Sequence, residues 1–224
     1  IIYNGRVLFS KKIIPKSALL VYEYISSFKF SNENEIYNKV KNLKLKIKKK
    51  FKIECSRLGE HNFSSQDINI KIGEIIYNKG NKVNLTNPDT IIYVDIINDF
   101  CIIGLNPKNI GKRNYKVRIS NDSLNPCLAY SLLKLAKFGK NKILLDPFCS
   151  DGTLLIEAAS LKGKKLYGFN QDVKNASINA KIAKVKINLS NKNLDWLDTL
   201  FKKISIDLII SKPMYESKKK KLNF

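Results

Sequence analysis

The segment from Lys142 to Ala159 constrains the fold of this chain more than any other stretch. An apolar run leads to Asp146, a short loop passes through Pro147 to Gly152, and apolar residues at helical spacing follow. A buried strand, a tight loop and a helix in this order are typical of the first unit of a doubly wound sheet, where ligands bind at the carboxyl ends of strands. Small residues in the loop let a ligand reach backbone N–H groups at a helix start. The pattern predicts a ligand site, although the spacing alone equally allows a strand that merely ends in Asp-Pro.

Strands and helices alternate on both sides of this segment. Asn125-Pro126 indicates a helix start, because Asn caps well and Pro suits the first helical position. A further helix is expected over residues 173–185. The expected strands cover residues 165–169, 186–189 and 207–210. The residues expected on buried helix faces are Leu128, Leu132, Leu135, Ile178, Ile182 and Val185. Alternation of this kind predicts a parallel sheet.

The amino-terminal half predicts a smaller α/β arrangement. A helix is expected over residues 15–28, with Val21, Tyr24, Ile25 and Phe28 on one face. Later helices are expected to be capped by Ser31 and Ser65, and a strand is expected at residues 51–55. Two apolar runs, at residues 91–97 and 100–105, flank Asn98-Asp99 and indicate a hairpin.

The charge balance favours a polyanionic partner. Lys and Arg number 41 against 19 Asp and Glu, a formal net charge of +22, which suits RNA. The chain is also rich in Lys, Asn and Ile, so codon bias is a second source of this charge. The densest basic stretches, Lys41–Lys52 and Lys218–Lys221, are equally explained as solvated faces.

Composition also excludes some classes of site. No apolar run approaches the ~18 residues of a membrane span, so we expect no membrane partner. Cys55, Cys101, Cys127 and Cys149 have no Cys-x-x-Cys spacing, and His61 is the only histidine. We therefore expect no metal site, and thiols kept reduced in the cytoplasm.

The wording of the central segment is more specific than its pattern. Asp146 to Thr153, followed by Ile156-Glu157-Ala158-Ala159, resembles D-P-F-C-G-S-G-T-x-x-I-E-A-A, the cofactor motif of S-adenosylmethionine-dependent RNA methyltransferases that carry a THUMP domain. The resemblance implies S-adenosylmethionine as cofactor. Ser150 stands at the first glycine of the family's G-S-G, where it must adopt a positive φ or obstruct the cofactor. The cofactor-binding residues implied are Asp146, Phe148, Cys149, Ser150, Asp151, Gly152, Asn170, Asp172 and Asp195, the last three following later strands.

A second resemblance covers the preceding half. Arg57-Leu58-Gly59-Glu60-His61-Asn62-Phe63-Ser64-Ser65, with Val83 to Asp89 and Ile103-Gly104, looks like a THUMP domain. This implies binding to tRNA or another structured RNA. The RNA-binding residues expected are Arg57, His61 and Ser65 in this domain, and Arg113, Tyr115 and Arg118 in the basic connector.

The two resemblances together imply a division of the chain. The expected parts are a ferredoxin-like helper region at 1–48, a THUMP domain at 49–106, a linker at 107–122 and a Rossmann-like methyltransferase domain at 123–224. The fold class is α/β, and the methyltransferase sheet is expected to be incomplete because its carboxy-terminal part is missing.

The catalytic motif departs most from the family. The resembling enzymes carry Asn/Asp-Pro-Pro-Tyr, where the amide or carboxylate and a proline carbonyl accept the target amine and the aromatic ring stacks on the base. This chain has Ser211-Lys212-Pro213-Met214-Tyr215. The catalytic residues expected by position are Lys212, Pro213, Tyr215 and Ser211. A charged Lys212 donates hydrogen bonds and accepts none.

Two functions follow. The first is methylation of a guanine exocyclic amine in tRNA or rRNA, with the base flipped into the pocket. The second is RNA binding without catalysis, by a degenerate protein or by one half of a split enzyme completed by a second polypeptide. Ser150, Asn170 and Lys212 together favour the second function.

Overall fold

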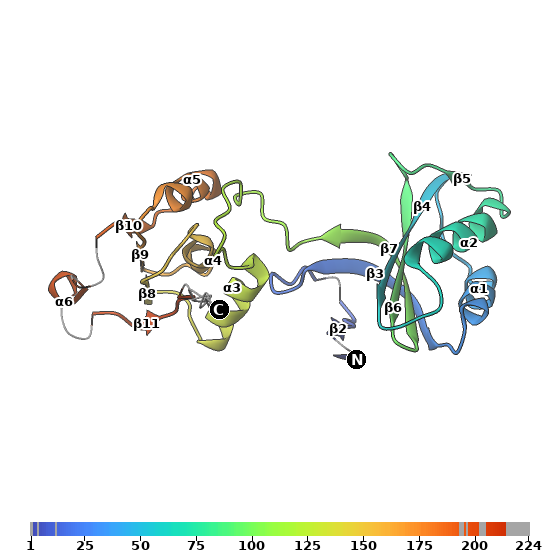
Figure 1. The fold of residues 1–224 in the computed structure, drawn as a ribbon, viewed down its shortest axis with the longest axis horizontal. Helices are drawn as coiled ribbons and strands as arrows, with labels where there is room; N and C mark the ends of the chain where they lie inside the picture. The colour runs from blue at the N-terminus through green and yellow to red at the C-terminus, as the bar shows by residue number, and fades with distance from the viewer. Residues whose placement is uncertain are drawn as a thin grey trace, which may run out of the picture. The chain divides into compact units, whose positions relative to one another are not determined.

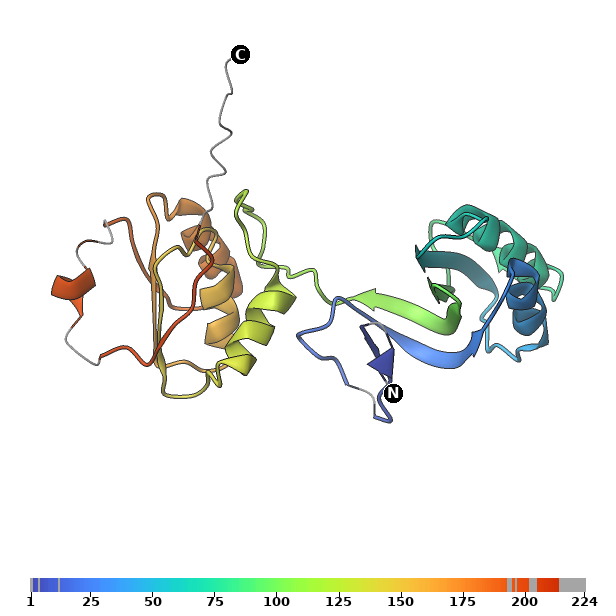
Figure 2. The ribbon, with the colours of Figure 1, turned by 60° about the horizontal axis from the view of Figure 1, so that its bottom comes forward.

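The computed structural model describes residues 2–3, 5–11, 13–192, 195, 197–201 and 205–213. The chain forms two compact units. The first contains the described residues up to Ile14 together with Leu20–Asn109, and the second contains Pro15–Leu19 and the described residues from Ile110 onward. Figures 1 and 2 show the elements of each unit in two views.

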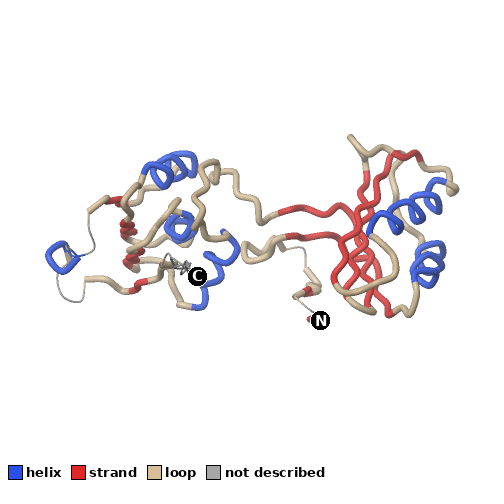
Figure 3. Tube along the Cα trace, in the orientation of Figure 1, coloured by secondary structure: helices blue, strands red, loops and turns tan. Residues whose placement is uncertain are grey.

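The first unit is a five-stranded sheet with two helices on one face (Figures 1 and 3). Its strand order is β3-β7-β6-β4-β5, in which β3, β7 and β6 are antiparallel neighbours and β6, β4 and β5 are parallel. The strands are β3 (Leu20–Lys29), β4 (Lys50–Leu58), β5 (Lys82–Val83), β6 (Thr90–Ile97) and β7 (Phe100–Asn109). The helices are α1 (Glu33–Asn42) and α2 (Ser65–Tyr77).

The core of this unit runs continuously across residue 48. Phe30, Ile36 and Val40 pack in one cluster with Phe51 and Ile53, beneath the buried isoleucines of α2. The elements expected in a helper region therefore share one core with the THUMP-like residues.

The helix expected at residues 15–28 is wrong, because residues 20–29 form β3. The register against β7 shifts between Val21 and Glu23 and again between Tyr24 and Ser26. These irregularities break the twofold alternation of a strand and bring Ile25 and Phe28, three residues apart, to the same core. The helical spacing in the sequence came from a bulged strand.

Two helix caps lie one residue from their expected positions. Asn32, not Ser31, caps α1, and Ser64, not Ser65, caps α2 through a reciprocal capping box with Asp67. The hairpin expected around Asn98-Asp99 is confirmed, and Asn98 adopts the left-handed φ of 51° that such a turn requires.

A short amino-terminal hairpin is fastened to the sheet by an ion pair. It consists of β1 (Ile2–Tyr3) and β2 (Arg6–Val7). Arg6 Nη2 lies 2.8 Å from Asp95 Oδ1, and the hydroxyl of Tyr22 donates to Asp95 Oδ2 at 3.0 Å. The Asp95 side chain is 2% exposed and that of Arg6 is 32% exposed, so the carboxylate is buried while the guanidinium still reaches water.

The second unit contains a four-stranded parallel sheet in the order β10-β9-β8-β11. The strands are β8 (Ile143–Asp146), β9 (Lys165–Phe169), β10 (Asn188–Ser190) and β11 (Leu208–Ile209), and the helices are α3 (Pro126–Leu135), α4 (Thr153–Ser160), α5 (Lys174–Ala183) and α6 (Leu197–Leu200). The chain moves outward from β8 through β9 to β10 and returns to the other side of β8 with β11. This order confirms the expected α/β class and places a topological switch point between β8 and β11.

The buried faces expected for α3 and α5 are partly wrong. Leu128 and Leu135 are 50% and 79% exposed, and Ile178 and Ile182 are 37% and 45% exposed. The buried residues are instead mostly small ones, namely Pro126, Cys127, Ala129 and Leu133 in α3 and Ala176, Asn179 and Ala180 in α5. Small side chains let these helices approach their neighbours closely, so the larger apolar residues lie outside the contact.

Candidate functional site

The site begins where β8 and β11 end side by side. Asp146 is the last residue of β8, and Ser211 follows β11 by two residues. The hydroxyl of Ser211 donates to Asp146 Oδ1 at 2.5 Å, and the backbone N–H of Phe148 donates to Ser211 Oγ and to Asp146 Oδ1, both at 3.2 Å. Ser211 therefore ties the two strand ends together at the switch point.

Asp146 is a buried carboxylate with a perturbed pKa. Its burial raises the pKa to about 6, and the hydrogen bonds from Ser211 and Phe148 oppose this shift. A carboxyl group kept out of water at the carboxyl end of a central strand is typical of a functional position.

The loop at residues 147–152 contains two residues with a left-handed backbone conformation where it turns toward α4. Ser150 has φ of 49° and Gly152 has φ of 79°. The positive φ that a serine must adopt in this motif is therefore present. Ser150 Oγ donates to Asp122 Oδ1 at 2.7 Å, so a side-chain bond accompanies a conformation that serine seldom adopts. A Cβ on Gly152 would lie 3.0 Å from the Cβ of Ala176, so glycine also lets α5 pack on the loop.

Asp151 is held inside the site. Its side chain is 1% exposed and lies 3.7 Å from Lys116 Nζ. It accepts from Ser123 Oγ at 2.5 Å, from Thr153 Oγ1 at 2.8 Å and from the Thr153 N–H at 3.3 Å. These bonds fix the loop at the start of α4.

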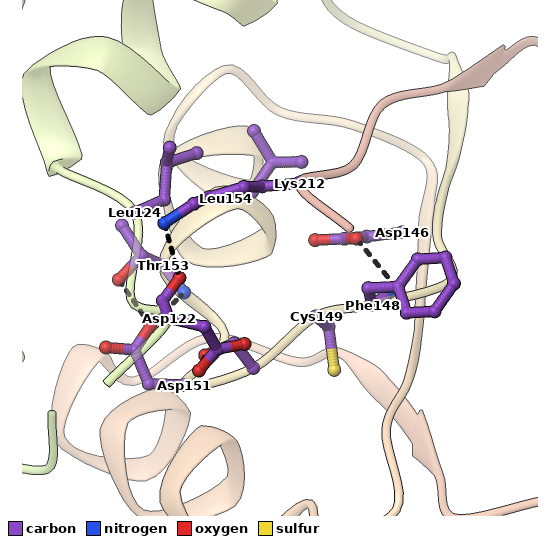
Figure 4. A pocket seen from close by; sticks show the side chains of 10 residues that line it. Asp122, Leu124, Asp146, Phe148, Cys149, Asp151, Thr153, Leu154 and Lys212 are labelled. Carbon is purple, nitrogen blue, oxygen red and sulfur yellow. Dashed lines mark hydrogen bonds between the residues drawn. The ribbon is translucent and has the colours of Figure 1, made fainter. Parts of the chain in front are cut away.

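Lys212 lies over the loop from the β11 side (Figure 4). Its ammonium donates to the backbone carbonyl of Asp122 at 3.0 Å. The cavity between Lys212 and the loop has a volume of about 10 Å³, room for about one water molecule.

The residues expected to hold a ribose lie at the end of the neighbouring strand. Asn170 follows β9, and its Nδ2 donates to the Asp172 carbonyl at 2.9 Å. Asp172 Oδ1 accepts from the Lys174 N–H at 2.8 Å and so stabilises the start of α5. Asp195 is exposed, two residues before α6. Tyr215 lies outside the described residues.

Two loop residues expected at the cofactor differ in their surroundings. Cys149 is buried in the core, its pKa is raised to about 12 by burial, and its N–H donates to the Phe169 carbonyl at 2.9 Å. Phe148 is half-buried and lines the cavity. Cys149 thus packs the loop onto β9, where Gly168 leaves room for its sulfur.

The expected RNA-binding residues of the first unit form a small cluster. Arg57 Nη1 donates to His61 Nδ1 at 3.0 Å, and His61 Nε2 donates to the Asn98 carbonyl at 2.7 Å. Because Arg only donates and a carbonyl only accepts, His61 carries its proton on Nε2. The ring of His61 lies beside Phe63, with centroids 4.9 Å apart. Ser65 is the first residue of α2, and it opposes the burial that raises the pKa of the Cys55 thiol to about 11.

The connector, defined here as residues 113–118, lies against α4, α5 and the 147–152 loop. Arg113 Nε and the Tyr115 hydroxyl each donate to Glu157 Oε1 at 2.8 Å, and Glu157 is 3% exposed. Arg118 exchanges two backbone hydrogen bonds with the Asn179 side chain. The polar groups of Arg113 and Tyr115 are therefore engaged within the unit.

Comparisons with known families divide the chain in the same order. The sequence model of the THUMP domain matches residues 30–106. The model described as the RMKL-like methyltransferase domain matches residues 113–220. The chain contains a THUMP domain followed by an RMKL-like methyltransferase domain. The resemblance drawn from the sequence motifs is thereby confirmed.

Curated proteins similar to this chain are named as tRNA-modifying enzymes. A tRNA (guanine(6)-N2)-methyltransferase of Methanocaldococcus jannaschii is 34% identical over 186 residues, which cover 71% of this chain and 48% of the relative. A tRNA (guanine(10)-N2)-dimethyltransferase of the same organism is 32% identical over 218 residues, covering 90% and 58%. The chain thus spans about half the length of these relatives or somewhat more.

A solved structure shares the fold. The crystal structure of TrmN from Thermus thermophilus superimposes with a TM-score of 0.69 at 25% identity, over 85% of this chain and 61% of that chain. A putative methyltransferase, SMU.472, complexed with SAH, superimposes with a TM-score of 0.66 at 16% identity and supports the fold alone. No helix in the part of the chain that the structure describes is long and apolar enough to cross a membrane.

The donor set fits a nucleoside cofactor in part. Carboxylate and amide groups follow β8 and β9 at the carboxyl ends of these strands. They can accept hydrogen bonds from the hydroxyl and ammonium groups of such a cofactor. Lys212 does not fit, because its cation opposes a sulfonium.

Sequence reasoning missed Asp122, Lys116 and Asn179, which contact the loop from other segments. Asn179 is one of several polar residues in α5, so the sequence carried no distinct signal for it.

Proposed function

We propose that the protein transfers a methyl group from S-adenosylmethionine to the exocyclic amine of a guanine in tRNA, and that it does so in the cytoplasm. The observation that carries the proposal is the ordered loop at the β8/β11 switch point, in the same chain as a THUMP domain. Guanine 6 is the first position to test, because it is named in the M. jannaschii relative and in further relatives from Archaeoglobus fulgidus and Thermus thermophilus.

Each part of the cleft has an assigned role in this proposal. The cofactor supplies an electrophilic methyl group. Asp146, Asp151 and the left-handed backbone at Ser150 and Gly152 shape the loop that receives its polar end. Asn170 and Asp172 are the candidates to accept bonds from ribose hydroxyls, and Asp195 is the candidate for the adenine amine. Phe148 lines the same cavity.

The catalytic segment must orient the target amine. The Pro213 carbonyl is the remaining acceptor by position, and Tyr215 is the candidate to stack on the flipped base. Ser211 acts through Asp146 rather than on the substrate, because its hydroxyl already bonds the two strand ends. A charged Lys212 cannot accept an N–H from the target amine.

A second candidate function is RNA binding without catalysis. Lys212 favours it, because its ammonium lies over the loop and cannot accept an N–H from a target amine. In this case the missing chemistry would come from a second polypeptide. β11 pairs with β8 alone among the described strands, so its outer edge is where such a partner would add a strand.

The experiment is methyl transfer from labelled S-adenosylmethionine to a tRNA transcript, paired with a transcript whose guanine 6 is replaced by adenine. The proposed function requires incorporation into the first transcript and loss of that incorporation in the second. Equal incorporation into both would move the target to another guanine. Saturable tRNA binding without cofactor binding, measured by calorimetry, would establish the second function instead.

A further inference from the structure

Asn179 is a fully buried amide that belongs to no expected site. It lies on α5 with 0% exposure, one turn after Ala176, the residue that packs against Gly152. Its Nδ2 donates to the Arg118 carbonyl at 2.7 Å and to the Asp151 carbonyl at 3.0 Å. Its Oδ1 accepts from the Arg118 N–H at 3.0 Å.

These bonds use the whole hydrogen-bonding capacity of the amide nitrogen. Both Nδ2 hydrogens go to carbonyls, one in the connector and one in the 147–152 loop, while the oxygen receives the connector N–H. Alanine offers none of these groups, and aspartate keeps only the acceptor. Asn179 therefore joins two backbone segments that no other described contact joins in the same way.

The neighbouring contacts run in parallel. Lys116 lies 3.7 Å from the Asp151 carboxylate and donates to the Leu124 carbonyl at 2.5 Å. Burial lowers the pKa of Lys116, and the Asp151 carboxylate opposes that shift. Glu157, in the helix that follows the loop, accepts from Arg113 and Tyr115. Connector, loop and helix thus form one connected polar network.

We propose that Asn179 is a positioning residue that locks the connector to the 147–152 loop, so that binding of the cofactor and ordering of the connector are coupled. The inference rests on the proposed function for the identity of the ligand. Coupling is reciprocal: if the locked connector favours the cofactor-binding form of the loop, then the cofactor stabilises the connector by the same free energy. The connector follows the THUMP domain along the chain. Cofactor binding would therefore change the order of a segment outside the loop that it contacts.

The test uses the full chain and two readouts. Hydrogen–deuterium exchange of the peptide that contains Arg118 measures the connector, and calorimetry with S-adenosylmethionine or S-adenosylhomocysteine measures the loop. In Asn179→Ala, we expect connector exchange to accelerate at least about tenfold and cofactor affinity to fall about tenfold, as loss of buried hydrogen bonds implies. The cofactor should slow connector exchange in the wild type and do so less in the variant.

Two further variants separate positioning from general damage. Asn175→Ala removes another amide of α5, which donates to Ser120 Oγ at 3.3 Å and does not bond the loop. This variant should leave connector exchange and cofactor affinity within about twofold of the wild type. Lys116→Met keeps the apolar stem and removes the ammonium near Asp151, and it should weaken cofactor binding even if Asn179→Ala does not fold.

A pH profile adds a signature of the Asn179 donors. Asn179→Asp places a buried carboxylate beside two carbonyls, which raises its pKa and removes both donors. Protonation restores one donor. Its cofactor affinity relative to wild type should therefore recover as pH falls, while that of Asn179→Ala relative to wild type stays flat.

The outcomes are distinguishable. Fast connector exchange with unchanged cofactor affinity would overturn the coupling, and unchanged exchange in Asn179→Ala would overturn the positioning role. If the wild type binds neither cofactor form, the proposed function fails, and the exchange comparison without ligand still decides whether Asn179 holds the connector.

Discussion

At the scale of single residues, Ser150 and Lys212 mark where this chain departs from the family it resembles. Ser150 adopts the left-handed conformation of the glycine it replaces, and its hydroxyl bonds Asp122. Lys212 replaces an acceptor with a donor and bonds the carbonyl of the same Asp122. Both departures thus lead to one segment, residues 122–124, that precedes α3.

Lys212→Asn tests whether the lysine limits this site. The amide would remove a cation from the cleft and restore an acceptor for the target amine. We expect S-adenosylmethionine to bind about tenfold more tightly, because a charge of the same sign as the sulfonium is removed from the cleft. S-adenosylhomocysteine, which lacks the sulfonium charge, should gain less. Calorimetry with both ligands makes the comparison, and an equal gain for both would point to steric relief instead.

Asp146 predicts a specific pH dependence of stability. Its folded pKa is raised to about 6, above an ordinary value of 3.8, so the folded state takes up this proton more readily than the unfolded state. The stability contributed by this group is therefore greatest at low pH and is lost as pH rises from about 4 through about 6.

The resulting loss of unfolding free energy is roughly 3 kcal/mol, because a difference of one in pKa between folded and unfolded states corresponds to about 1.4 kcal/mol. Urea unfolding of wild type and Asp146→Asn at pH 4.5 and 7.5 makes the measurement. The variant, which keeps an acceptor for Ser211 and Phe148, should become more stable relative to wild type at the higher pH. A difference between the two proteins that does not change with pH would rule out this titration.

At the scale of elements, the amino-terminal hairpin depends on one buried contact. Arg6→Ala leaves the buried Asp95 carboxylate with the Tyr22 hydroxyl but without the Arg6 guanidinium, and breaking a pair of this kind costs about 3–5 kcal/mol. The measurement is urea unfolding. Lys29→Ala is the matched control, because the Lys29–Asp99 pair is 75% and 54% exposed and should contribute little. Equal losses in both variants would mean that burial of Asp95 is not the cause.

The helices of the second unit explain why apolar spacing misplaced their faces. Ile178 and Ile182 are the larger apolar side chains of α5, yet its contact with the 147–152 loop is made by Ala176 and Asn179. Close packing against Gly152 leaves room only for small side chains such as Ala176. The nearby backbone N–H and C=O groups need a side chain that both donates and accepts hydrogen bonds. A pattern of hydrophobic residues contains neither piece of information.

At the scale of the whole molecule, RNA binding should divide between two kinds of arginine. Arg57 is exposed in the THUMP domain, whereas Arg113 bonds the buried Glu157. Arg57→Ala should weaken tRNA binding. It should also reduce the slope of the logarithm of the association constant against the logarithm of salt concentration by the amount expected for about one phosphate contact. Arg113→Ala should instead lower stability and leave the salt dependence nearly unchanged. Filter binding across a salt series, with thermal melts, distinguishes them.

Local sequence determined the parts that depend on neighbours along the chain. The motif from Asp146 to Gly152, the helix start at Asn125-Pro126 and the hairpin at Asn98-Asp99 were predictable, because turn geometry and capping depend on a few adjacent residues. The alternation of strands and helices likewise predicted the parallel sheet. Tertiary structure alone decided what meets this loop: Asp122 at Ser150, Asn179 at the Asp151 carbonyl, and Ser211 at Asp146. These partners come from 28, 28 and 65 residues away in the chain, and only the packing of helices and strands brings them within hydrogen-bonding distance.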